Sequence, residues 1–141
     1  MKIAIVASQF NQFITERLLK ACLAELARQG VKNKNIELVW VPGAFEVPVT
    51  ALKLAQKKTI SSVICLGAVI RGETLHFELV ARAVSDGILQ ASLLTGKPII
   101  FGVLSTDTVT QAEKRSEAKG DNKGRDAALA ALAMIKVLQK I

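Results

Sequence analysis

The sequence has 141 residues, of which 50% are hydrophobic and 22% charged, and it carries a formal net charge of +7. This composition excludes a disordered chain, and the first apolar run is too short for a membrane span or a secretory signal. The positive charge favours an anionic partner, either nucleic acid or a phosphorylated small molecule. Because the basic residues are scattered among acids at helical spacing, we expect solvated helix faces and no nucleic-acid partner. From the short first apolar run we expect a cytoplasmic protein with no membrane partner.

Short apolar runs alternate with amphipathic segments along the chain. The runs predict buried strands at residues 2–7, 36–41, 62–70 and 98–105. The other segments predict helices at residues 13–30, 45–58, 75–96, 108–118 and 122–141. Pro48 fits the second helix only in its first turn, where its missing N–H breaks no hydrogen bond.

Strands that are apolar nearly throughout indicate a parallel sheet covered on both faces. We therefore predict one domain over residues 1–141, an α/β three-layer sandwich with four parallel strands in flavodoxin-like order and a C-terminal helix pair. Cys22 and Cys65 lie inside apolar segments and read as small buried thiols of a protein in a reducing compartment. With one histidine in the chain, a zinc site is not expected.

Ligands of such sheets bind beyond the carboxyl ends of the strands, so these positions hold the candidate residues. After the first strand, Phe10 could stack on a planar ring or simply close the core. After the second, "PGAFE" (42–46) brings small residues that let a ligand approach the backbone. Its Glu46 could accept hydrogen bonds from sugar hydroxyls or merely complement a helix dipole.

The third strand is followed by "RGETLH" (71–76), which combines an anion site with a titratable side chain. Gly72 permits close approach, and Glu73 and Thr74 lead into a helix whose free N–H groups favour an anion. His76, in the first turn, could move a proton or be a hydrogen-bonded spectator. No GxGxxG or GxxxxGK[ST] motif is present, so nucleotide binding is not supported.

Taken together, these stretches resemble the lumazine synthase family, in family order over nearly the whole chain. The matching blocks are SQFNQFIT (8–15), WVPGAFEVP (40–48), LGAVIRGETLHFE (66–78), IIFGVLSTD (99–107) and QAEKRSEAKGDNKGRDAALAAL (111–132). The resemblance implies that 5-amino-6-(D-ribitylamino)uracil condenses with 3,4-dihydroxy-2-butanone 4-phosphate to 6,7-dimethyl-8-ribityllumazine, phosphate and water. It also implies the penultimate step of riboflavin biosynthesis, no metal or organic cofactor, and a homo-oligomer, either a pentamer or an icosahedral shell of pentamers.

The resemblance assigns roles to residues at all four strand exits. It sets Phe10 against the pyrimidine ring and makes His76 the proton donor and acceptor. Ala44, Phe45 and Glu46 would hold the ribityl chain and ring edge. The backbone of Ala68, Val69 and Ile70 would face the pyrimidine, and that of Glu73 and Thr74 would bind the phosphate.

Two further residues would reach the site from a neighbouring subunit. By position alone, Phe101 would be core and Arg115 solvated. The resemblance instead makes Arg115 the second half of a phosphate clamp, with Lys119 assisting, at a subunit interface. The alternative is a non-catalytic shell-forming or flavin-binding protein of the same fold, which has no need of Phe10, Glu46, His76 and Arg115 together.

Overall fold

The four apolar runs form one parallel sheet, as predicted. In the computed structural model, which describes residues 1–141, the strands are β1 (Lys2–Ser8), β2 (Ile36–Val41), β3 (Ile60–Ile70) and β4 (Ile99–Thr106). Their order is β2-β1-β3-β4, which confirms the flavodoxin-like prediction and leaves β2 and β4 as edge strands. Because all pairs are parallel, the carboxyl ends of the four strands meet at one edge of the sheet.

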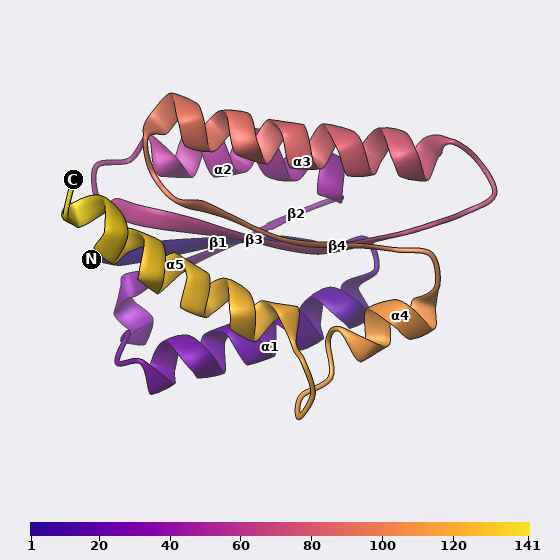
Figure 1. Ribbon diagram of the computed structural model, residues 1–141, viewed down its shortest axis with the longest axis horizontal. Coiled ribbons are helices and arrows are strands. Elements are labelled where there is room, and N and C mark those ends of the chain that lie inside the picture. Colours follow the sequence, from indigo (N-terminus) through magenta and orange to yellow (C-terminus); the bar gives the residue numbers. More distant parts are fainter.

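Helices cover both faces of the sheet (Figure 1). One face carries α1 (Gln12–Arg28) and α5 (Lys123–Gln139), and the other carries α2 (Val47–Ala55) and α3 (His76–Thr95). Shorter elements are α4 (Val109–Lys114) and the 3-10 turns η1 (Asn33–Asn35) and η2 (Ala44–Glu46). This arrangement confirms the three-layer sandwich. None of the helices combines the length and the apolar character that crossing a bilayer would require.

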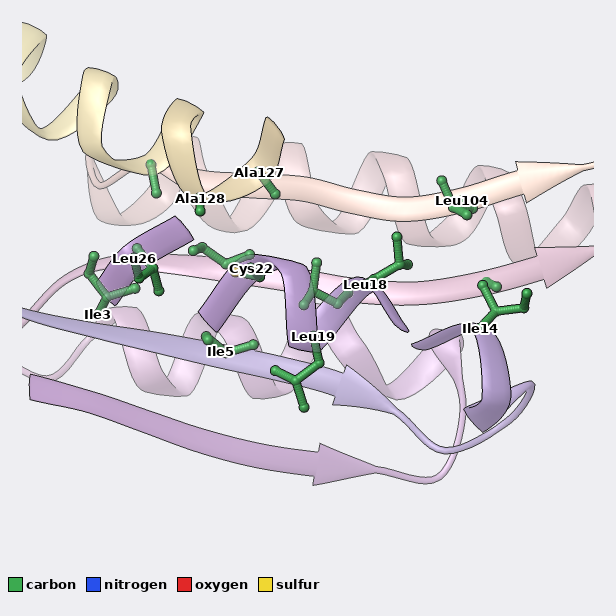
Figure 2. Close-up of a cluster of buried hydrophobic side chains, with 14 of the residues drawn as sticks. Ile3, Ile5, Ile14, Leu18, Leu19, Cys22, Leu26, Leu104, Ala127 and Ala128 are labelled. Carbon is green, nitrogen blue, oxygen red and sulfur yellow. The ribbon is translucent and has the colours of Figure 1, made fainter. Parts of the chain in front are cut away.

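The core lies in two apolar clusters, one on each side of the sheet. In the first, the side chains of α1 predicted from their spacing of four, Ile14, Leu18, Cys22 and Leu26, are all fully buried. Figure 2 shows these four side chains along α1, with Ala127 and Ala128 of α5 in the same cluster. The two helices approach closely because the second residue of α5 is Gly124, where a Cβ atom would collide with the backbone of Leu18.

The local signals for helix ends and buried thiols are confirmed. Pro48 lies in the first turn of α2. The C-cap of α3 is Gly96, whose φ of 65° suits a residue without a side chain. Cys22 and Cys65 are buried and unpaired. Burial disfavours the thiolate, so it raises the pKa of Cys22 to about 12 and shifts that of Cys65 in the same direction.

Two predicted helices are shorter than the sequence pattern indicated. The segment 45–58 divides into η2 and α2, which ends at Ala55. The segment 108–118 is helical only over Val109–Lys114. At its carboxyl end, Arg17 donates to the carbonyls of Glu113 (3.1 Å) and Ser116 (3.3 Å), so side-chain hydrogen bonds satisfy carbonyls that a longer helix would pair.

A buried carboxylate on α1 gives the fold a defined response to acid. Glu25 is 5% exposed and accepts hydrogen bonds from Arg28, at 2.6 and 3.0 Å, and from Gln29, at 2.9 Å. These bonds lower the pKa of Glu25 from 4.5 to about 2. Because the folded pKa is depressed, the stabilisation is complete above the unfolded pKa and is lost as the pH falls towards the folded one.

We therefore expect Glu25→Gln to be less stable than the natural chain at pH 7. The difference in free energy of unfolding should shrink between pH 4.5 and about 2, since the natural carboxylate is protonated there and glutamine does not titrate. Urea denaturation across this range measures it. A difference that stays constant down to pH 2 would show that the ion pair does not couple to folding.

Candidate active site

The exits of β1, β2 and β3 are joined by hydrogen bonds into one surface at the carboxyl edge of the sheet. The N–H of Gln9 donates to the carbonyl of Val41 (2.8 Å), and that of Phe10 to the carbonyl of Pro42 (3.0 Å). On the other side, the side-chain amide of Asn11 donates to the carbonyl of Ala68 (2.9 Å). These bonds hold the loops after β1 and β2 in fixed positions relative to each other and to the end of β3.

The two phenylalanines at this edge face outwards. Phe10 is 71% exposed and Phe45 is 65% exposed, so neither ring belongs to the core of the chain. The alternative in which Phe10 closes the core is therefore wrong. Its ring is held out because Asn11, with φ of 57°, turns the chain sharply into α1. An exposed aromatic ring of this kind can stack on a planar ligand.

The stretch after β2 presents an unpaired carboxylate beside these rings. Ala44 is buried and anchors the η2 turn, whereas Glu46 is exposed at the N-cap of α2. The carboxylate of Glu46 makes no hydrogen bond or ion pair within the chain. Its place suits the helix dipole and also leaves the oxygens free to accept from hydroxyl groups.

The loop between β3 and α3, residues 71–75, carries free backbone donors. None of the N–H groups of residues 72–75 donates to another group of the chain. His76 is the first residue of α3, and its N–H donates to the hydroxyl of Thr74 (3.3 Å). The loop therefore combines backbone donors, the amino end of a helix and an exposed imidazole, a combination that can bind an oxyanion and move protons beside it.

Phe101 and Arg115 lie elsewhere, along the free edge of β4. Phe101 is 49% exposed, and both residues line an open pocket of about 320 Å³ with Ser105, Lys123 and Asp126. The lining contains no residue from the exits of β1, β2 or β3. Within one chain, the structure thus brings ten of the predicted site residues to the carboxyl edge and places these two in a separate pocket.

This pocket adds two residues that the sequence analysis did not single out. Lys123 and Asp126 form an ion pair of 3.4 Å in the first turn of α5. Asn122 caps that turn by accepting from the N–H of Gly124 (2.8 Å) and Arg125 (3.2 Å). In the sequence, Lys123 and Asp126 could have been noticed only because they lie in the last of the family-like blocks, 111–132.

Comparison with known proteins decides the family. The sequence model described as 6,7-dimethyl-8-ribityllumazine synthase matches residues 1–139. The chain belongs to the 6,7-dimethyl-8-ribityllumazine synthase family. The 6,7-dimethyl-8-ribityllumazine synthase of Syntrophus aciditrophicus (strain SB) is 53% identical over 141 residues, covering 100% of this chain and 92% of that protein. Membership in the lumazine synthase family, expected from the motifs, is confirmed.

Proposed function

We propose that this chain is a transferase of riboflavin biosynthesis that makes 6,7-dimethyl-8-ribityllumazine. Its substrates are 5-amino-6-(D-ribitylamino)uracil and 3,4-dihydroxy-2-butanone 4-phosphate, and phosphate and water are released. Family membership over the whole chain supports the reaction. The observation that carries it in the structure is the β3–α3 loop, where unpaired N–H groups adjoin His76.

The carboxyl edge provides the first half of the active site. Phe10 stacks on the pyrimidine, the backbone of Ala68, Val69 and Ile70 faces its polar edge, and Ala44, Phe45 and Glu46 hold the ribityl chain. These assignments are supported by the outward ring of Phe10 and the unpaired carboxylate of Glu46. The N–H groups of Glu73 and Thr74 bind the phosphate, and the free donors of the loop support this role.

The chemistry consists of imine formation, elimination of phosphate and ring closure with loss of water. Each step moves a proton between partners held in place, so His76 as donor and acceptor, together with orientation, provides the catalysis. The substrate phosphate is an anion, and the net charge of +7 draws it to the protein. No residue in this scheme requires a metal or an organic cofactor.

A neighbouring subunit provides the second half of the site, with Phe101 and Arg115. The separate pocket of these residues along an edge strand supports this arrangement. Arg115 is exposed, and only one nitrogen of its guanidinium donates within the chain, to the carbonyl of Gln111 (3.2 Å). A planar guanidinium with free donors is well suited to a phosphate that the first subunit only half encloses.

The exposed apolar residues of α3 support the assembly. Around this helix, five leucines, each at least 60% exposed, face away from the core: Leu75, Leu79, Leu89, Leu93 and Leu94. An apolar surface of this extent is typical of a contact between proteins. We infer a homo-oligomer of single-domain subunits, either a pentamer or an icosahedral shell of pentamers, which light scattering distinguishes. A cytoplasmic location stays a prediction.

The purified protein should form lumazine faster than the spontaneous condensation of the two substrates. Lumazine absorbance and released phosphate, followed together, measure the reaction. Turnover no faster than the uncatalysed mixture would favour the alternative, a shell-forming or flavin-binding protein without this activity.

A further inference from the structure

Arg71 joins three elements at the carboxyl edge. Its Nε donates to Oδ1 of Asp107 after β4 (2.7 Å), and its Nη1 donates to Oε1 of Glu78 in α3 (3.0 Å). The guanidinium carbon lies 4.6 Å from the centroid of the Phe77 ring. The backbone N–H of Arg71 donates to the carbonyl of Thr106 (2.9 Å). One side chain thus connects the end of β3, the end of β4 and the first turn of α3.

These contacts enclose the β3–α3 loop, which has few contacts of its own. Residues 71–75 are all exposed, and the N–H groups of residues 72–75 bind nothing within the chain. The loop is fixed at its start by the backbone of Arg71 and at its far end by the guanidinium on Glu78 and Phe77. The side chain of Arg71 therefore fixes the separation between the end of β3 and the first turn of α3, which the loop connects.

The charge of Arg71 is already matched by carboxylates. Its hydrogen bonds to Asp107 and then to Glu78 raise its pKa above the ordinary value, so the guanidinium stays charged. Two carboxylates against one guanidinium leave the cluster with a net negative charge. A guanidinium that is already paired in this way is a poor ligand for a phosphate, although its place in the motif "RGET" (71–74) suggests a phosphate ligand.

We propose that Arg71 is a positioning residue for the phosphorylated substrate, which holds the β3–α3 loop so that its free N–H groups and His76 face the same ligand. This inference rests on the proposed function and deepens it. Arg71 acts through Asp107 and Glu78, and it does not touch the substrate. A planar fork is required because two carboxylates from different elements must be held at once.

The sign of the effect of the carboxylates separates positioning from direct binding. Glu78→Ala and Asp107→Ala each remove a negative charge near the phosphate site, and simple electrostatics would then strengthen phosphate binding. Positioning predicts the opposite, because either change releases one arm of the fork. We expect each variant to raise the KM for the phosphorylated ketone several-fold, and Arg71→Met to raise it about tenfold. The KM for the pyrimidine substrate should change by less than about twofold.

Steady-state kinetics of the full chain with each substrate varied in turn tests the proposal. Arg71→Lys should resemble Arg71→Met, since a single ammonium cannot hold both carboxylates. Arg82→Met removes an exposed arginine of α3 that has no ion pair, and it should leave both KM values unchanged. Adding Glu78→Ala to Arg71→Met should cost less than the sum of the single effects.

Three results would overturn the inference. They are a lower KM for the phosphorylated ketone in Glu78→Ala or Asp107→Ala, full retention of that KM in Arg71→Lys, and equal loss of affinity for both substrates. Failure of the proposed function would be seen separately, as absence of turnover in the natural chain. If Arg71→Met does not fold, the carboxylate variants still decide the matter, because both side chains are more than half exposed.

Discussion

His76→Ala is expected to lower kcat by between about 100-fold and 10,000-fold while both KM values change little. The imidazole lies in the first turn of α3, directly after the loop with free N–H groups, so its loss removes proton transfer and leaves the backbone donors in place. Initial rates of lumazine formation at saturating substrate measure the effect.

A matched variant separates chemistry from damage to the loop. Leu75→Ala removes the neighbouring side chain, which is 71% exposed, and should lower kcat far less than His76→Ala. Equal losses in the two variants would mean that the shape of the turn matters and the imidazole does not. An unchanged kcat in His76→Ala would remove His76 from the mechanism.

The second large effect is expected for Arg115→Ala, in substrate binding. The KM for the phosphorylated ketone should rise about 10- to 100-fold, because a charge-assisted hydrogen bond to the phosphate is lost. The KM for the pyrimidine substrate should remain near its natural value. Competition by inorganic phosphate should weaken in parallel, which gives a readout that does not depend on turnover.

Lys114→Ala is the control for this change. It removes the same charge from the last turn of α4, but Lys114 does not line the pocket that contains Arg115. A similar rise in KM for both variants would point to the general field of the protein and would contradict a specific role for Arg115.

Much of the fold could be predicted because the strands are buried on both faces. Burial could be predicted from the four apolar runs and from the spacing of Ile14, Leu18, Cys22 and Leu26, and the structure confirms both predictions. The end of α4 could not be predicted in this way. It depends on Arg17, which approaches Glu113 and Ser116 only once α1 and α4 have packed.

The positions of candidate site residues could be predicted where local sequence determines them, but not where they depend on contacts between distant segments. His76 lies in the first turn of a helix, as predicted from the end of the apolar run and the Gly72 that follows it. The ion-pair partners of Arg71 could not be predicted from the sequence. Asp107, for example, follows another strand and approaches Arg71 only because β3 pairs with β4. The outward direction of Phe10 likewise depends on the turn at Asn11.

We infer that each active site takes His76 from one subunit and Arg115 from another. The most direct test is to refold His76→Ala and Arg115→Ala together in equal amounts. The refolded mixture is then assayed at a concentration of the phosphorylated ketone at which each variant alone is nearly inactive. Activity should return to about a quarter of the natural value, because random assembly gives that share of interfaces both intact groups. Activity no greater than the mean of the two separate variants would contradict it.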